Sequence, residues 1–273
     1  IVDTWARIAY DTGPIIKGWT NTIIEGFILD GTDSGRTSVA FPDQTAPDSG
    51  SHSGVFLAAG ADKAQVRNLY VRKVYYGIVA LTTTNSKIVN SQITDIGRDG
   101  IHLLTSSTGN EVSGDTIERV YHNTAHGHGI KFNGASNNTV RNCLVRQTNF
   151  GIEFDVTGSG NRVYANDIVN VDTGVWLANA STDSFVHNNI TGAKKLVEIS
   201  STGGFDARRN WWGSRDLTVI NGGIANTAGG TATLHPILVG PIDTRTVAAD
   251  TVPPGKPETF AVNGVSSLGS RIA

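Results

Sequence analysis

Apolar and polar residues alternate in short runs that recur through the middle of the chain. Each run consists of a glycine, an apolar residue, a variable residue and a second apolar residue. The four copies are Gly100-Ile101-His102-Leu103, Gly129-Ile130-Lys131-Phe132, Gly151-Ile152-Glu153-Phe154 and Gly174-Val175-Trp176-Leu177. Strict alternation predicts short β-strands with one face buried and the other in water. The variable positions His102, Lys131, Glu153 and Trp176 are therefore expected to be exposed.

A second pattern recurs between these runs, in which two apolar residues are separated by four others. It is found at Ile23/Ile28, Val66/Val71, Ile88/Ile93, Val112/Ile117, Val140/Val145, Val163/Ile168 and Phe185/Ile190. From the second copy onward the spacing between copies stays in the twenties of residues, which is typical of solenoid proteins. No copy carries a helical period, so leucine-rich and helical repeats fit poorly.

The pattern predicts an all-β protein, a right-handed parallel β-helix of about eight to nine turns. Equivalent residues of successive turns would stack at the strand spacing of about 4.8 Å. Two corner columns are also expected to stack, because Asn and Asp tolerate the left-handed backbone of tight corners. The first column is Asn110, Asn138, Asn161 and Asp183, and the second is Asp115, Cys143, Asn166 and Asn188. Cys143 is interpreted as a small buried corner residue.

Residues 1–240 are expected to form this solenoid, with a polar loop insertion at residues 30–52 and a C-terminal cap at residues 206–240 that contains two tryptophans. Residues 241–257 are predicted to be a linker. Its end, Asp250 to Pro257, resembles the lead-in to a fibronectin type III domain, and residues 258–273 would begin that domain. Further modules of a longer chain are then expected to follow.

Composition excludes some classes of partner. A net charge of −2 with no basic run argues against nucleic acid, and no apolar run is long enough to span a membrane. Abundant Gly, Asn, Ser and Thr with one cysteine are typical of secreted bacterial proteins. The chain starts at Ile1 without a methionine or a signal peptide, so we expect a piece of a longer extracellular or cell-surface protein.

Stacking the turns gathers chemically active side chains on one face, which we call the outer row. Its candidate catalytic residues are His102, His128, Lys131, Glu153, Asp155 and Asp99, and its candidate substrate-binding residues are Trp176, Asn133 and Arg98. An indole can stack on a sugar ring while charged groups bind hydroxyls or uronates. For β-elimination or epimerisation of a uronate, His128 or His102 would be the base and Lys131 or Arg98 the cation. For glycoside hydrolysis, Glu153 would act with Asp155 or Asp99.

Two other interpretations of the row remain open. Outward residues of a solenoid must be polar, and a His-Lys-Glu run across neighbouring strands also satisfies ordinary cross-strand pairing. His102, His122, His126, His128 and His187 fall in the middle turns, but their spacing matches no metal motif. We expect no cofactor, and a divalent metal such as calcium stays open as an alternative although it has no recognisable motif here.

Three phrases resemble a known superfamily: His128-Gly129-Ile130-Lys131-Phe132, Asn137-Asn138-Thr139-Val140-Arg141-Asn142 and Asn210-Trp211-Trp212-Gly213-Ser214. They resemble secreted right-handed parallel β-helix proteins of the pectate-lyase-like superfamily, within its carbohydrate-binding and sugar-hydrolase repeats. The resemblance covers roughly residues 22–213 and implies an extracellular polysaccharide or cell-surface glycan as partner. The Asp-Pro-His motif of alginate epimerases and the calcium-ligand patterns of pectate lyases are absent, so no family catalytic residue is transferred.

The sequence therefore supports two hypotheses. In the first, the protein is an enzyme that processes polysaccharide. A uronate lyase or epimerase is preferred to a glycoside hydrolase. In the second, it is a non-catalytic structural or adhesive module of a surface or filament protein, or a viral tail-spike segment, and binds glycan or acts as a rigid spacer. Oligomeric state is left open by the sequence.

Overall fold

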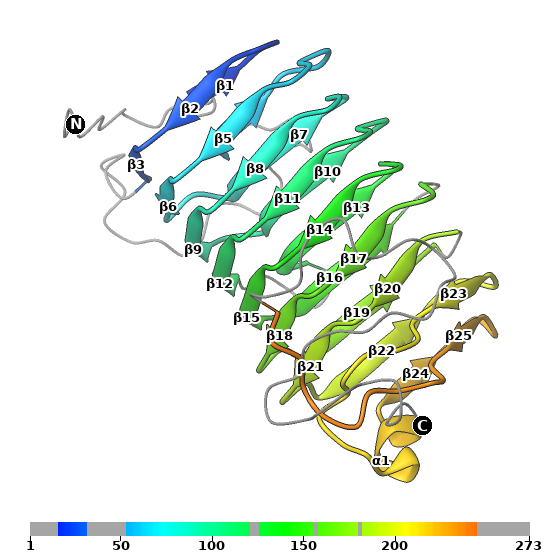
Figure 1. The fold of residues 1–273 in the computed structure, drawn as a ribbon. Helices are drawn as coiled ribbons and strands as arrows, with labels where there is room; N and C mark the ends of the chain where they lie inside the picture. Colours follow the sequence, from blue (N-terminus) through cyan, green and yellow to red (C-terminus); the bar gives the residue numbers. More distant parts are fainter. Residues whose placement is uncertain (1–15, 32–52, 121–125, 156–157, 180–181, 245–273) are drawn as a thin grey trace.

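The computed structural model of the protein describes residues 16–31, 53–120, 126–155, 158–179 and 182–244. Within these ranges the strands form three parallel sheets that wind around one axis (Figure 1). Most of the predicted insertion at residues 30–52 and the predicted module at residues 258–273 lie outside the described residues, as does His122.

The three sheets, called A, B and C here, each receive one strand from every complete turn. Sheet A contains β1 (Ile16–Gly18), β4 (Ser53–Leu57), β7 (Tyr76–Leu81), β10 (Asp99–Leu104), β13 (His128–Asn133), β16 (Phe150–Asp155), β19 (Thr173–Leu177), β22 (Lys195–Ile199) and β24 (Ile224–Asn226). Sheet B contains β2 (Ile23–Glu25), β5 (Gln65–Arg67), β8 (Lys87–Val89), β11 (Glu111–Ser113), β14 (Thr139–Arg141), β17 (Arg162–Tyr164), β20 (Ser184–Val186), β23 (Gly204–Asp206) and β25 (Thr231–Thr233). Sheet C contains β3 (Ile28–Asp30), β6 (Tyr70–Arg72), β9 (Gln92–Ile96), β12 (Thr116–Val120), β15 (Leu144–Thr148), β18 (Asp167–Val169) and β21 (Asn189–Thr191). Seven three-stranded turns are thus followed by two partial turns, close to the predicted number.

The core consists of apolar columns inside the solenoid, as the repeats predict. In sheet A, Ile78 pairs with Ile101, Ile101 with Ile130, and Ile130 with Ile152, and all four are fully buried. Each such side chain contributes roughly 1.5–3 kcal/mol through burial. The corresponding column of sheet B is Val66, Ile88, Val112, Val140, Val163 and Phe185. The interior is therefore one continuous apolar stack.

Glycines precede the inner column of sheet A because there is no room for a side chain there. A Cβ on Gly129 would lie 2.3 Å from Val145 Cγ1 and 2.7 Å from the carbonyl oxygen of Gly151. Sheets A and C therefore approach each other closely at this column. The residue just before each glycine points outward, and so does the second residue after it. The outer row therefore takes two residues from each strand.

Side-chain ladders hold the corners, as predicted. The Nδ2 and backbone N of Asn138 both donate to Asn161 Oδ1, at 3.0 Å each, and Asn161 donates in the same way to Asp183. At the second corner Asn166 donates to Asn188, while Cys143 is buried and donates its backbone N to Asn166 Oδ1. These bonds satisfy corner amides that would otherwise be buried without a partner.

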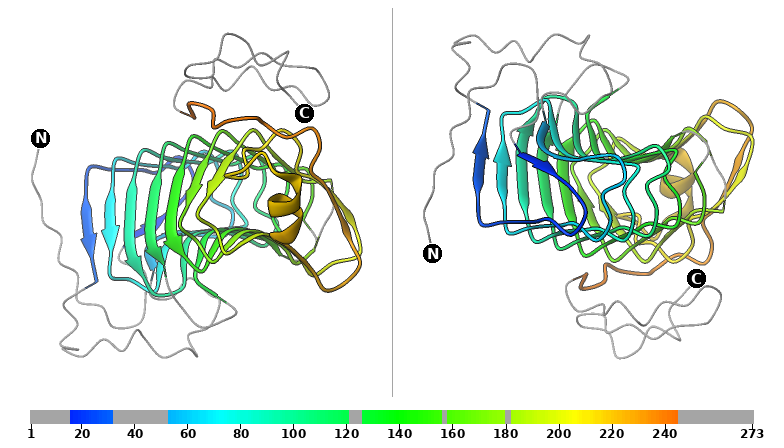
Figure 2. Two further views of the ribbon diagram at one scale, coloured as in Figure 1. Left: turned by 90° about the horizontal axis from the view of Figure 1, so that it is seen from below. Right: turned by 90° about the horizontal axis from the view of Figure 1, so that it is seen from above.

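The predicted cap region, residues 206–240, contains β24, β25 and the short helix α1 (Leu217–Gly222), which lies at the C-terminal end of the solenoid (Figure 2). Trp212 is buried and stacks on Phe185 with ring centroids 6.2 Å apart. The segment that follows packs on the outside of the solenoid, where Ile242 exchanges hydrogen bonds with Asn189. The start of the predicted linker, residues 241–244, is therefore docked.

No helix in the described ranges is long and apolar enough to cross a membrane.

Candidate active site

The outer row lies on the outer face of sheet A, over β10, β13, β16 and β19. Parallel pairing sets its register: His102 is beside Lys131, Lys131 beside Glu153, and Glu153 beside Trp176. In the column before the glycines, Asp99 is beside His128 and His128 beside Phe150. The predicted neighbours are confirmed.

The expected exposure of the row is wrong for most of it. His102 and Glu153 are 1% exposed and Lys131 is 5% exposed, while Trp176 is half-buried. Alternation shows correctly that these side chains point away from the solenoid core, but it contains no information about groups that pack over that face. Asp99 and His128 are also fully buried, whereas Asn133 and Asp155 are half-buried.

The buried charges form one connected network. His128 Nδ1 is 2.6 Å from Asp99 Oδ1, and His128 Nε2 is 2.8 Å from Glu153 Oε2. Lys131 Nζ is 3.0 Å from both Glu153 Oε2 and Asp155 Oδ2. His102 joins at the other end, with its Nδ1 3.2 Å from Asp99 Oδ2. All six candidate catalytic residues are thus brought together.

Opposite charges shift the pKa values of three groups of this network against the effect of burial. Burial would raise the pKa of Asp99, but His128 and the hydrogen bonds from both histidines hold that pKa well below its ordinary value. Burial would lower the pKa of His128, and the charges of Asp99 and Glu153 raise it instead. The pKa of Lys131 is likewise raised, against burial, by Glu153 and the two aspartates. His128 is therefore a buried cation between two carboxylates.

Aromatic rings pack against the network. Phe150 stacks on both His128 and Trp176, with ring centroids 5.0 Å and 4.8 Å away, and the rings of His128 and Trp176 are themselves 6.1 Å apart. The indole Nε1 of Trp176 donates to Ser200 Oγ at 3.1 Å. Trp176 is thus held in one orientation with part of its surface open, as a sugar-binding plate requires.

Arg98 and His126 lie beside the other end of the row. Arg98 is largely buried and donates to Tyr76 Oη, and its Nη2 is 3.4 Å from His126 Nε2. Burial, aided by the charge of Arg98, lowers the pKa of His126 to about 4. The predicted substrate-binding Arg98 is therefore engaged with protein groups.

Sequence reasoning missed Phe150 and Tyr76 as parts of this face. Both directly precede a glycine of the repeated phrase, as Asp99 and His128 do. Comparing that position across all copies would have found them.

Among the described residues, no group of three or more His, Cys, Asp or Glu is arranged to hold a metal ion.

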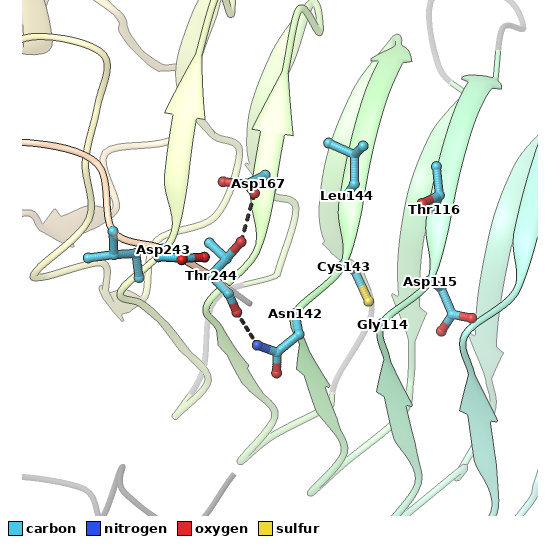
Figure 3. Close-up of a pocket in the computed structure, with 10 residues that line it drawn as sticks. Gly114, Asp115, Thr116, Asn142, Cys143, Leu144, Asp167, Asp243 and Thr244 are labelled. Carbon is cyan, nitrogen blue, oxygen red and sulfur yellow. Dashed lines mark hydrogen bonds between the residues drawn. The ribbon is translucent and has the colours of Figure 1, made fainter. Parts of the chain in front are cut away.

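A hollow of about 650 Å³ lies elsewhere, between the outside of sheet C and the docked segment at Ile242 to Thr244 (Figure 3). Asp115, Asn142, Cys143 and Asp167 line it, and Thr244 Oγ1 donates to Asp167 Oδ2 at 2.7 Å. None of the outer row lines this hollow. The chemistry is concentrated on sheet A, so we place the candidate site there.

The model of the right-handed β-helix region family matches residues 53–233. The chain belongs to this family. No curated protein matches it in sequence. The match covers every strand of the outer row, so the row is built on the family's repeat.

Several solved structures share the fold. An alginate lyase from Paenibacillus sp. str. FPU-7 is 11% identical over 68% of this chain and 76% of its own, with a TM-score of 0.51. The catalytic unit of an α-1,3-glucanase from Streptomyces thermodiastaticus is 12% identical over 82% and 50%, with a TM-score of 0.55. The Dettilon tailspike protein is 16% identical over 78% and 47%, with a TM-score of 0.52. This chain spans about half the length of the last two.

Proposed function

We propose that this protein is an extracellular or cell-surface glycoside hydrolase whose reacting carboxylates are Glu153 and Asp155. The contacts of Lys131 carry the proposal. One Nζ atom lies 3.0 Å from an oxygen of each carboxylate, so the two oxygens are at most about 6 Å apart. Retaining glycosidases hold their two carboxyl groups about 5–5.5 Å apart, and inverting enzymes hold them farther apart.

The network suggests a role for each group. His128 Nε2 lies 2.8 Å from Glu153 Oε2, so a proton from His128 would reach the leaving oxygen through Glu153, which acts as the general acid. Asp155 would attack the anomeric carbon while the bond to the leaving sugar breaks and its oxygen takes the proton of Glu153. Water would then release the sugar from Asp155, giving its proton back to Glu153 and its hydroxyl to the anomeric carbon. Asp99 positions the ring of His128 and stabilises its charge.

Charge distinguishes this proposal from uronate elimination or epimerisation, which the sequence favoured. The cation of those reactions must be free to bind the substrate carboxylate. Lys131 already contacts two carboxylates, and Asp99 lies nearby, so an anionic sugar would meet like charges. A neutral sugar chain avoids this repulsion. The solved neighbours, which include a glucanase, support a glycan partner through their shared fold only.

The test is a panel of neutral and uronate-containing polysaccharides, scored for new reducing ends and for the ultraviolet absorbance of unsaturated uronates. Glu153→Gln and Asp155→Asn would be compared with wild type and with Glu198→Gln. Glu198 is the matched control because it lies on the same outward column and pairs with a lysine, Lys195, at 3.0 Å outside the network. We expect new reducing ends from a neutral glycan, lost in the first two variants and retained in the control.

Other outcomes would contradict the proposal in different ways. Unsaturated product from a uronate polymer would establish the lyase instead. Equal loss in the Glu198→Gln control would remove the assignment to the Glu153 and Asp155 pair. No product from any polymer, with folded protein throughout, would favour the non-catalytic surface module.

A further inference from the structure

His102 is the one candidate catalytic residue to which the proposed hydrolysis gives no role. It is 1% exposed, and its Nδ1 lies 3.2 Å from Asp99 Oδ2. Its Nε2 is buried and has no hydrogen-bond partner among the described residues. Buried polar atoms are normally paired, so a histidine that leaves one nitrogen unpaired requires an explanation. The ring of His102 acts on Asp99, and not on the reacting carboxylates.

Packing alone would favour an apolar residue at position 102. In the register of sheet A, His102 lies beside Val79 of β7, which is also 1% exposed. Its ring is 5.9 Å from the ring of Tyr76, and Tyr76 and Val79 belong to one apolar cluster. A phenyl ring would occupy similar space without burying an unpaired nitrogen. The contact with Asp99 is therefore the property that distinguishes a histidine here.

The carboxylate of Asp99 is divided between two histidines. Its Oδ1 lies 2.6 Å from His128 Nδ1, its Oδ2 lies 3.2 Å from His102 Nδ1, and the residue is fully buried. An ionised carboxylate only accepts hydrogen bonds, so each Nδ1 must carry a proton. A proton given by one histidine makes the carboxylate less basic toward the other.

Other ionisable groups surround the two histidines without replacing this arrangement. Those that lie beside them are Tyr76, Arg98, His126, Lys131 and Glu153. Lys131 contacts two carboxylates, and burial lowers the pKa of His126 to about 4, which leaves it neutral near pH 7. The contacts of the Asp99 oxygens among the described residues are the two histidines, so a change at His102 reaches His128 through Asp99.

We propose that His102 is a positioning residue that shares Asp99 with His128 and so limits how firmly His128 holds its proton. Acting through His128, it makes that proton more available to Glu153. The two histidines, which the sequence offers as alternative bases, then have different roles. The effect on catalysis rests on the proposed hydrolase, whereas the sharing of Asp99 is observable in the protein without substrate.

Two substitutions separate the nitrogen of His102 from its ring. His102→Phe keeps a ring of similar size and removes the donor to Asp99. His102→Asn keeps an N–H group near the position of Nδ1 and removes the ring. The proposal expects the asparagine variant to behave like wild type and the phenylalanine variant to differ from it. A role in packing alone predicts the reverse order.

The first measurement follows His128 by NMR in the protein without substrate. Its ring signal is assigned by its loss in His128→Gln, and its midpoint is read from a pH titration. In His102→Phe we expect the midpoint to rise by about 0.5–1 pH unit, which is part of the ~1–3 units that a full neighbouring charge produces. Val79→Ala is the matched control, because it removes atoms beside His102 and keeps both histidines. It should lower the melting temperature and leave the midpoint unchanged.

The second measurement is the pH profile of kcat on the neutral polymer that the protein hydrolyses. In His102→Phe the alkaline limb should move upward with the NMR midpoint, because the limb reports loss of the proton that His128 supplies. The maximum of kcat should fall roughly two- to fivefold, since a more firmly held proton makes a weaker acid, while KM stays unchanged. His102→Asn should restore both values.

The two measurements fail in different ways. A His128 midpoint that is the same in wild type and His102→Phe would overturn the sharing of Asp99. A normal phenylalanine variant beside a damaged asparagine variant would show that His102 only fills space. A shifted midpoint without a shifted kcat limb would uphold the sharing and overturn the catalytic role of His102. A shifted midpoint in a protein that hydrolyses no polymer would uphold the sharing and overturn the proposed hydrolase.

Discussion

The inner and outer columns of the same three strands are buried to nearly the same extent by different means. Ile101, Ile130 and Ile152 are 0% exposed inside the solenoid, and His102, Lys131 and Glu153 beside them are at most 5% exposed outside it. The inner column is a stack of equivalent apolar residues. In the outer column each charge depends on a particular partner: Lys131 and His128 both contact Glu153, and His102 contacts Asp99.

This difference separates residues that fold the protein from residues that give it chemistry. Apolar burial stabilises almost without regard to order, so the inner column tolerates exchange of one aliphatic residue for another. A buried ion pair is often no more stable than apolar residues of the same shape. The outer network is therefore poorly explained by folding alone, which is consistent with a functional site.

The largest effect is expected from placing a charge in the inner column. Ile130→Asp puts an unpaired carboxylate into a fully buried stack, where no described cation lies beside it. We expect loss of more than about 4 kcal/mol of unfolding free energy, with several turns unfolded. Chemical denaturation measures this, and Ile130→Val, at about 0.5–1.5 kcal/mol, is the control. A loss for the aspartate no larger than for valine would show that the column is not a tight core.

The outer column should respond to single and paired changes in opposite ways. Lys131→Ala leaves Glu153 buried without its amine partner and should cost about 3–5 kcal/mol. Lys131→Met combined with Glu153→Gln removes the pair together and should leave stability unchanged or higher, while abolishing any hydrolysis. Unfolding curves of both variants decide this. If the double variant is as unstable as Lys131→Ala, the pair is a structural necessity and our separation of the two columns fails.

The sequence predicts the inner column, both corner ladders and the register of the row, because these follow from a repeat that returns in every turn. It also predicts that Lys131 lies between His102 and Glu153. It does not predict their burial, because alternation shows which face a side chain occupies and not what packs over that face. Nor does it predict the ring stack of His128, Phe150 and Trp176, which depends on side-chain orientation between turns.

The pH dependence of stability tests the charge in the outer network. The pKa of His128 is raised by Asp99 and Glu153 against burial, so its contribution is full below the ordinary pKa of about 6.5 and is lost as pH rises through the raised value. Wild type should therefore exceed His128→Gln in melting temperature most strongly near pH 5–6.5 and less above. A difference that stays constant into the alkaline range would mean that His128 is neutral in the folded protein.

The smallest effect is expected at a second buried carboxylate, Asp115, which we compare with Asp99. Asp99, between two histidines, has a lowered pKa, whereas burial raises the pKa of Asp115 at the inner corner to about 8. Asp115 Oδ1 accepts from the backbone N of Ser91 at 2.7 Å, and Oδ2 has no hydrogen-bond partner among the described residues. The folded protein thus holds a proton on Asp115 that the unfolded chain releases above about pH 4, so rising pH favours unfolding until about pH 8.

Asp115→Asn should remove this penalty, because Asn166, one position along the same ladder beyond Cys143, uses its Nδ2 to donate to Tyr164 O and Val140 O. We expect a gain of roughly 1–3 kcal/mol near pH 7.5 that shrinks toward pH 4. The reverse change, Asn166→Asp, should destabilise the protein with a loss that grows over the same pH interval. Denaturation of both variants at several pH values measures the two slopes. A gain for Asp115→Asn that does not vary with pH would show that Asp115 is ionised in the fold, and that an inner carboxylate can persist without the cations that the outer network supplies.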